Sequence, residues 1–340
     1  MSKHMNRSMI LSRRPNGEIR EGDLTLVSNE VPPIDDGQML IQVLWLSLDP
    51  YMRPLMNDSK SYANPMAIGG VIYGESVGRV IESRTDRFAV GDTVTCHTGW
   101  QEYCVVDGSQ ATIHKIVSNG VPLQAFLGVA GMPGRTGFCG LTHLGKPQAG
   151  ETVVVAAAAG PVGSVVGQTA KRLGCRAVGI AGGSEKCRFL EDELGFDAAI
   201  DYKSGDLLEQ LRAACPNGID VYFENVGGEV TRAVAQLLNP GSRAPVCGYV
   251  SAYNATDMSA VETPFDIFAA MDSPPDHRFF LVGEWQDQHE ELTELLANRV
   301  RNGELKYRES VAEGLNNAIE AFEGMLTGKN FGKQLVHIAD

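Results

Sequence analysis

The stretch 151–174 (ETVVVAAAAGPVGSVVGQTAKRLG) constrains the fold of this chain more than any other. Its three consecutive valines, Val153 to Val155, form an apolar run too short for a helix and typical of a buried parallel strand. A glycine turn (AAGPVG, 158–163) follows, and apolar residues then recur at helical spacing up to Gly174, where a glycine cap would end a helix. The stretch therefore predicts a strand, a tight turn and a helix.

This arrangement is the context that a dinucleotide-binding turn requires. Small residues let the backbone approach a pyrophosphate, and the amides at a helix N-terminus attract its charge. We therefore expect Gly160, Val162 and Gly163 to contact a dinucleotide, although the first glycine of the usual pattern is Ala158 here. Pro161 suits the first position of a helix but removes one amide. A glycine turn that binds nothing is the alternative reading of the same pattern.

The rest of the chain divides into two parts with different predicted patterns of secondary structure. Up to about residue 125, short strand-like runs alternate with turns, as in a β-rich domain. The clearest strand is 39–46, a second is 69–81, whose glycines suggest a bend, and 87–94 is typical of a turn that leads into a further strand. Beyond it, strands alternate with helices, which predicts an α/β fold with a doubly wound parallel sheet covered on both faces. The predicted strands are 176–181, 197–202, 219–224, 243–248 and 279–282, and the predicted helices are 184–194, 206–214 and 230–238. The tail, a helix at 320–325 and a strand at 332–338, is expected to return to the first domain.

Composition excludes several classes of protein. A net charge of −13 makes nucleic acid and anionic membranes poor partners, and no apolar run approaches the ~20 residues of a membrane span. The N-terminal residues contain no apolar segment of the signal-peptide type. The seven cysteines are odd in number and never spaced CxxC, which predicts reduced thiols and a cytoplasmic protein.

The loop after the second predicted strand indicates which nucleotide is bound. Ala181 stands where an NAD site would carry an acid for the ribose diol, and Lys186 lies just beyond it. Five basic residues and one acidic residue lie between Gly160 and Arg188, a local charge of +4. The pattern favours NADP(H), with its 2′-phosphate, over NAD(H).

A series of motifs resembles one family along nearly the whole chain. The chain is similar to the medium-chain dehydrogenase/reductase superfamily, in its zinc-independent branch of prostaglandin reductases, leukotriene 12-hydroxydehydrogenases, alkenal double-bond reductases and curcumin reductases. The matching stretches are 46–53 (LSLDPYMR), 99–103 (GWQEY), 132–136 (MPGRT), 157–171, 181–187, 195–203, 218–228, 247–254, 305–308 (LKYR) and 328–333 (GKNFGK).

The resemblance implies a GroES-like catalytic domain (1–125, completed by 305–340), a Rossmann domain (126–304) and a homodimer. It implies that Lys186 and Tyr202 bind the 2′-phosphate. Asn225, Tyr253 and Asn330 would contact the rest of the cofactor. The predicted cofactor-binding set is completed by Met132, Pro133, Thr136, Cys247, Phe280 and Val282.

Residue types argue against zinc. Zinc-dependent relatives carry a histidine where this chain has Gly74, and their early cysteine ligand falls near Ser47. Because a catalytic zinc keeps three protein ligands, commonly Cys and His, we expect no metal. The histidines, among them His97, show no ligand spacing, and we expect structural or surface roles for them.

Without zinc, a substrate carbonyl must be polarised by hydrogen bonds. We expect hydride transfer to the β-carbon of an α,β-unsaturated ketone or aldehyde, with a hydroxyl donor stabilising the enolate. Tyr253 is the first candidate, and Tyr51 and Tyr73 are candidate pocket tyrosines. A quinone reductase, a metal-free alcohol dehydrogenase and a non-enzymatic NADPH-binding protein remain as alternatives. The segment 257–276 is acidic and unlike the loop that the family usually carries here. Because such loops shape the substrate pocket, the identity of the substrate is the part of the prediction that the sequence constrains least.

Overall fold

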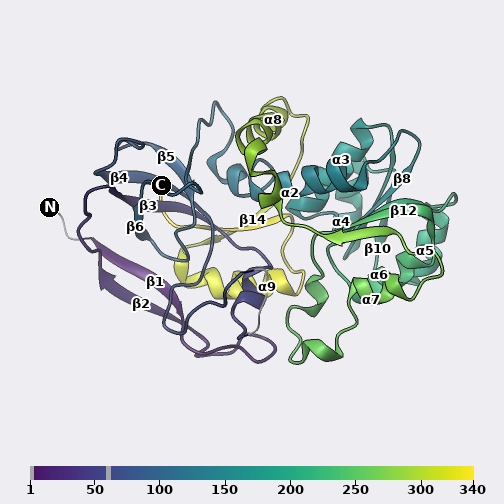
Figure 1. Cartoon of the computed structure of the whole chain (residues 1–340), viewed down its shortest axis with the longest axis horizontal. Helices are drawn as coiled ribbons and strands as arrows, with labels where there is room; N and C mark the ends of the chain where they lie inside the picture. The colour runs from purple at the N-terminus through teal and green to yellow at the C-terminus, as the bar shows by residue number, and fades with distance from the viewer. Residues whose placement is uncertain (1–3, 59–62) are drawn as a thin grey trace. The chain divides into compact units, whose positions relative to one another are not determined.

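The computed structural model describes residues 4–58 and 63–340, and the chain divides into two compact units (Figure 1). The first unit comprises Met1–Leu127 and Glu309–Asp340, and the second comprises Gly128–Arg308. Among the described residues, no helix is long and apolar enough to cross a membrane.

The first unit is built on a mixed sheet in which β3 (Gln38–Ser47) is central. The strand order is β14-β15-β3-β4-β5-β7, and β6 also pairs with β3. The C-terminal β15 lies antiparallel to β3, so the tail completes this sheet. The remaining elements are β1 (Met5–Leu11), β2 (Leu24–Glu30), α1 (Met52–Leu55), β4 (Ser76–Ser83), β5 (Thr93–Cys96), β6 (Tyr103–Asp107), β7 (His114–Lys115), η1 (Leu123–Leu127), β14 (Glu309–Glu313), η7 (Leu315–Asn317), α9 (Ala318–Leu326) and β15 (Lys333–His337).

The predicted strand 39–46 is confirmed as β3, but the strand predicted over 69–81 begins only at Ser76. Gly69 adopts a φ of +79°, and the amide of Gly70 bonds back to the carbonyl of Ala67 in a turn. These glycines therefore bend the chain before the strand begins. The core beneath the sheet contains the fully buried Trp100, which packs edge-on against Phe322 of α9.

The second unit is a six-stranded sheet in the order β10-β9-β8-β11-β12-β13, with every pair parallel. The order is that of a doubly wound nucleotide-binding fold, as predicted. Helix α3 (Pro161–Arg172) packs on β8 and β9, α4 (Ser184–Arg188) packs on β9 and β10, and α2 (Met132–Cys139) packs on α3. Helices α5 (Leu207–Ala214), α6 (Gly228–Ala235) and α7 (Pro264–Ala269) pack in a row on one another (Figure 1). The strands are β8 (Thr152–Ala156), β9 (Arg176–Ala181), β10 (Ala198–Asp201), β11 (Ile219–Phe223), β12 (Leu238–Val246) and β13 (Asp276–Phe279).

The helices of the second unit include several that the sequence did not predict, among them α2, α7 and α8. Phe189–Glu193 continues α4 in π-helical geometry, so the predicted helix 184–194 is one uninterrupted segment. The helical elements are α2 (Met132–Cys139), η2 (Gly140–Gly145), α3 (Pro161–Arg172), α4 (Ser184–Arg188), η3 (Phe189–Glu193), α5 (Leu207–Ala214), α6 (Gly228–Ala235), η4 (Val250–Ala252), η5 (Met258–Ala260), α7 (Pro264–Ala269), η6 (Val282–Gln288) and α8 (His289–Arg301).

The last strand of this sheet lies three residues earlier than predicted. The apolar run that begins at Phe279 marks the end of β13 (Asp276–Phe279). Phe280 follows the strand and is buried edge-on against Phe223, while Val282 begins η6. The hydrophobicity of Phe280 therefore reflects core packing and not a strand.

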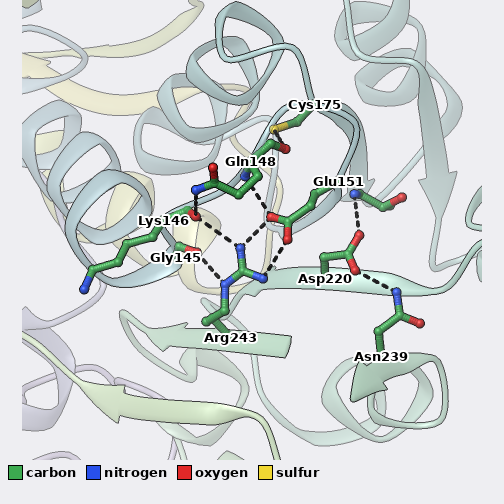
Figure 2. Close-up of polar contacts among 9 residues, drawn as sticks. Gly145, Lys146, Gln148, Glu151, Cys175, Asp220, Asn239 and Arg243 are labelled. Atoms are coloured by element: carbon green, nitrogen blue, oxygen red, sulfur yellow. Dashed lines mark hydrogen bonds and ion pairs between the residues drawn. The ribbon is translucent and has the colours of Figure 1, made fainter. Parts of the chain in front are cut away.

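A polar network closes the N-terminal edge of the parallel sheet (Figure 2). The guanidinium of Arg243 on β12 makes two bonds to the carboxylate of Glu151, just before β8, and one to the carbonyl of Gly145. Asp220 on β11 accepts hydrogen bonds from the amide of Thr152, at 2.8 Å, and from the side chain of Asn239, at 2.7 Å. This edge is occupied by structural contacts, whereas the opposite edge carries the loops in which the predicted residues Gly160, Asn225 and Tyr253 lie.

Candidate cofactor and catalytic site

The glycine turn joins β8 to α3 in the predicted way. Pro161 is the first residue of the helix, and Gly160 caps it in an extended conformation. The first helical hydrogen bond runs from the amide of Ser164 to the carbonyl of Gly160, at 2.9 Å. The amides of Val162 and Gly163 precede that bond, so they are the helix-end donors for an anion.

Gly163 is required by a close approach of the backbone. A Cβ at this position would lie 2.6 Å from the carbonyl oxygen of Ala157 and 2.6 Å from the Cα of Ala158. Any side chain here would push the helix away from the turn and from a pyrophosphate. The turn therefore has the tight geometry that a dinucleotide cradle needs.

A cluster of Lys186, Tyr202 and Lys203 follows β9 and β10, the strands next in the sheet to β8 and its glycine turn. A Cβ at Gly182 would lie 2.9 Å from Cε of Lys203 and 3.0 Å from the hydroxyl of Tyr202, so both side chains cover that glycine. The ammonium of Lys203 is 5.8 Å from the centroid of the Tyr202 ring. Burial, together with the nearby Lys203 ammonium, lowers the pKa of Lys186. The structure thus brings together the predicted Lys186 and Tyr202 and adds Lys203.

Two ammonium groups and one hydroxyl suit a phosphate dianion. An anion would relieve the repulsion between the lysines and accept charge-assisted hydrogen bonds from both. The neighbouring carboxylate of Asp201 accepts bonds from the amides of Gly183, at 2.8 Å, and Lys203, at 3.0 Å. Because that acid serves the backbone, the donor set of the cluster fits a 2′-phosphate. Lys203 had a signal in the sequence, its place immediately after Tyr202, but was assigned no role.

Asn225 and Tyr253 lie on the loops after β11 and β12. The side-chain amide of Asn225 donates to the carbonyl of Ala156, the last residue of β8, at 2.8 Å. The hydroxyl of Tyr253 lies so close to Gly248 that a Cβ there would be 2.7 Å from it. Both residues therefore come from the C-terminal edge of the sheet, as the glycine turn does, where nucleotides bind in this fold.

The predicted residues of α2 are tied to α3. A Cβ at Gly137 of α2 would lie 2.7 Å from the carbonyl of Val162, so the two helices touch beside the glycine turn. Thr136 is buried, and its hydroxyl donates to the carbonyl of Met132 at 2.7 Å. Its remaining lone pair can accept a hydrogen bond. Pro133, in the first turn of α2, is also buried.

Three further predicted residues differ in how they can contact a cofactor. Burial raises the pKa of the Cys247 thiol to about 12, so the thiol is uncharged at neutral pH. Phe280 packs in the core against Phe223 and Trp285, which leaves its backbone and not its ring for a ligand. Val282 is the first residue of η6.

Three predicted site residues belong to the first unit. The rings of Tyr51 and Tyr73 lie edge to face with centroids 6.3 Å apart. The imidazole of His97 stacks on Tyr73 at 5.0 Å and extends this aromatic group, which the sequence did not indicate. Burial and the nearby Glu75 raise the pKa of Tyr73 to about 12, so its hydroxyl stays protonated. The side chain of Asn330 donates to the carbonyl of Gly332, at 2.8 Å, in the loop before β15.

A buried ion pair fixes the segments that carry Tyr51 and Asn330. The ammonium of Lys333, at the start of β15, bonds to the carboxylate of Asp49 at 2.6 Å and to the carbonyl of Leu48 at 2.7 Å. Asp49 precedes Tyr51 by two residues, and Lys333 follows Asn330 by three. Because both charged side chains are almost fully buried, the pair holds the two segments in a defined register.

The two positions at which zinc-dependent relatives carry ligands hold other contacts here. The hydroxyl of Ser47 donates to the carboxylate of Asp49. A Cβ at Gly74 would lie 3.1 Å from Met52 and 3.1 Å from Trp100, so a histidine does not fit without repacking. Within residues 4–58 and 63–340, no group of three or more His, Cys, Asp or Glu side chains is arranged to hold a metal ion.

Comparisons with known proteins cover nearly the whole chain. Residues 7–114 match the family described as the N-terminal domain of oxidoreductase, and residues 161–298 match the family described as zinc-binding dehydrogenase. The NADPH-dependent curcumin reductase of Escherichia coli (strain K12) is 42% identical over 99% of this chain and 98% of its own. The 2-alkenal reductase (NADP(+)-dependent) of Nicotiana tabacum is 37% identical over 98% of each chain.

A solved structure agrees with these relatives. The crystal structure of CurA from Vibrio vulnificus in complex with NADPH has a TM-score of 0.91 and 42% identity, and the match covers 98% of this chain and 99% of that one. The sequence resemblance and the parallel sheet therefore lead to the same assignment. The chain belongs to the medium-chain dehydrogenase/reductase superfamily, in the branch that contains the curcumin, alkenal and prostaglandin reductases.

Proposed function

We propose that this protein is an NADPH-dependent reductase that saturates the C=C bond of α,β-unsaturated aldehydes and ketones. The observation that carries the choice of cofactor is the cluster of Lys186, Tyr202 and Lys203 after β9 and β10. The curcumin and alkenal reductases among the relatives support the choice of reaction. In this proposal Gly160, Val162 and Gly163 hold the pyrophosphate.

The remaining cofactor contacts are proposed for the residues that the sequence resemblance indicates. Asn225, Tyr253 and Asn330 contact the rest of the cofactor. Thr136, held in α2, accepts one hydrogen bond. The backbone around Met132, Pro133, Cys247, Phe280 and Val282 completes the contacts.

The chemistry supplied by bound NADPH is a hydride, delivered to the β-carbon of the substrate. Negative charge then develops on the carbonyl oxygen, where a preorganised hydroxyl donor stabilises it better than water does. We assign this role first to Tyr253. Tyr73 is the second candidate, because its hydroxyl is a protonated donor in the same aromatic group as Tyr51. Tyr51 forms the edge-on partner of Tyr73 against the substrate. The proton for the α-carbon comes from one of these hydroxyls or from water.

The proposal is tested by turnover with a labelled cofactor. The purified protein is mixed with NADPH and short enals, aryl enones or quinones, and consumption of NADPH is followed by its absorbance. With NADPH deuterated at the transferable hydrogen, the product should carry deuterium on the former β-carbon. Deuterium on the carbonyl carbon would indicate an alcohol dehydrogenase instead. Turnover of quinones alone would indicate a quinone reductase, and no turnover with any substrate would leave a non-enzymatic NADPH-binding protein.

We further propose a cytoplasmic homodimer. The family resemblance supports the dimer, and the free state of all seven cysteines is compatible with a reducing compartment. Sedimentation velocity of the purified protein tests the assembly, since a monomer at micromolar concentration would contradict it.

A further inference from the structure

Glu224 places a fully buried carboxylate at the end of β11, inside the nucleotide-binding unit. The carboxylate accepts hydrogen bonds from the amide of Val226, at 2.7 Å, from the amide of Gly227, at 3.0 Å, and from the hydroxyl of Thr231. All three of these donors are uncharged groups. A buried charge is costly without such bonds, so the arrangement requires an explanation.

The carboxylate bonds the turn that leads into α6 (Gly228–Ala235). Gly227 is the N-cap residue and has no side chain to accept from the first amides of the helix. Glu224 accepts instead from the amide of Gly227 itself, from that of Val226 before it and from the hydroxyl of Thr231 within the helix, so it ties the turn to the helix. The side chain thereby fixes the conformation of the turn 225–227.

The turn 225–227 holds the loop after β12 through backbone hydrogen bonds. Three successive carbonyls accept hydrogen bonds from backbone amides of that loop. The carbonyl of Glu224 accepts from the amide of Cys247 at 2.9 Å, and the carbonyl of Asn225 accepts from the amide of Val250 at 3.1 Å. The carbonyl of Val226 accepts from the amide of Ser251 at 3.0 Å. A Cβ at Gly227 would lie 2.8 Å from Cβ of Tyr249, so the turn and the loop are also in direct contact. The loop ends at Tyr253, two residues beyond the last of these bonds.

We propose that Glu224 is a positioning residue for the cofactor site, holding Asn225 and the loop that carries Tyr253 in the geometry that binds NADPH. The inference rests on the proposed function only in that Asn225 and Tyr253 contact the cofactor. An apolar side chain would fill the same space but leave the turn amides without an acceptor. The turn would then rearrange, and the loop bonded to it would move as well.

Two substitutions at Glu224 distinguish loss of the hydrogen-bond acceptor from a change in side-chain volume. Glu224→Gln keeps an amide oxygen for Val226 and Gly227, and its NH₂ group can donate to the Thr231 hydroxyl. Glu224→Leu keeps similar bulk and has no acceptor. We expect the Kd for NADPH, measured by quenching of protein fluorescence, to rise about ten- to a hundredfold in Glu224→Leu and less than about threefold in Glu224→Gln.

Asp220→Leu is the matched control for a merely structural role. Asp220 lies on the same strand and also accepts from a backbone amide and a side-chain amide, but at the opposite edge of the sheet (Figure 2). We expect it to lower the melting temperature without changing the Kd for NADPH. Equal Kd values for Glu224→Leu, Asp220→Leu and the wild-type protein would overturn the inference.

Amide hydrogen exchange of the cofactor-free protein provides a second readout. In Glu224→Leu, residues 225–228 and 247–253 should exchange faster together, while the strand β9 stays as protected as in the wild-type protein. Faster exchange confined to 225–228 would overturn the inference. If Glu224→Leu does not fold, Thr231→Val removes one of the three donors, and the same two segments should respond. A failure of the proposed function would appear in the wild-type protein, as NADPH binding without turnover, and would leave this comparison valid.

Discussion

The space that Gly248 leaves empty is occupied by the hydroxyl of Tyr253. A Cβ at position 248 would lie 2.7 Å from that oxygen, whereas ordinary contact begins at 3.4 Å, so Gly248→Ala must displace the hydroxyl by about 0.7 Å. The backbone of Gly248 is outside the left-handed region, so alanine introduces no strain of its own. The displaced atom is the end of a flexible side chain, and we expect the unfolding free energy to change by less than about 1 kcal/mol.

Catalysis should respond far more strongly than stability. A misplacement of about 1 Å in a reacting group can reduce the rate about 10²-fold. We therefore expect Gly248→Ala to lower kcat/KM for an enone about ten- to a hundredfold, or about 1.4–2.7 kcal/mol of transition-state stabilisation. Steady-state kinetics with NADPH and one aryl enone measures this, and urea denaturation measures stability in parallel.

A double-mutant cycle identifies the hydroxyl as the cause. In the Tyr253→Phe background the nearest atom to a Cβ at 248 is the ring carbon Cζ, at 3.8 Å, which is an ordinary contact. Gly248→Ala should then reduce kcat/KM by less than about twofold, because the displaced group is already absent. Gly324→Ala in α9 is the control, since its Cβ would have only Lys329 within 4 Å, at 3.8 Å. An equal loss in both backgrounds, or no loss in either, would refute the placement of Tyr253 as the carbonyl donor.

Three further predictions address the other parts of the molecule. Lys203→Gln should reduce the preference for NADPH over NADH about ten- to a hundredfold, as loss of one charge-assisted bond would, and an unchanged ratio of kcat/KM values would remove Lys203 from the phosphate site. Arg243→Ala should lower the unfolding free energy by about 1–3 kcal/mol with an unchanged Kd for NADPH, because its partly exposed contacts with Glu151 lie at the opposite edge of the sheet. Burial holds the pKa of His97 below its ordinary 6.5, so the unfolded state binds more protons and stability should fall as pH drops below 6.5. His97→Phe, which keeps the ring against Tyr73, should flatten that slope in denaturant titrations at several pH values.

The sequence predicted those helices and strands whose limits are set by residues next to them in the chain. The helix after the glycine turn runs from Pro161 to Arg172, and Gly174 adopts the left-handed conformation expected of a C-terminal cap. The strand predicted at 176–181 is β9, residue for residue. The helix begins at Pro161 and ends just before Gly174, and the strand ends just before Gly182. These boundaries therefore depend on neighbouring residues alone.

Features that depend on distant partners were not predictable in this way. The strand β14 (Glu309–Glu313, ESVAE) has little apolar content and exists because it pairs with β15. The approach of Lys203 to Lys186 follows from the pairing of β9 with β10, which places the ends of two strands side by side. Likewise, Glu224 in the sequence ends an apolar strand, and only its burial and its hydrogen bonds reveal that it holds the turn before the next helix.

The variant glycine turn shows how two unusual residues can be accommodated without loss of the anion site. Pro161 removes an amide that has no acceptor within the helix, and the two donors that follow it remain. Ala158, in place of the usual first glycine, brings a methyl group that must be buried against the neighbouring strand. A Cβ at Gly179 on β9 would lie 2.9 Å from that methyl, so the space for the alanine exists because residue 179 is a glycine. In this chain the glycine that makes room is residue 179 on the adjacent strand and not the first residue of the turn. The turn therefore keeps its close backbone packing although its first residue is alanine.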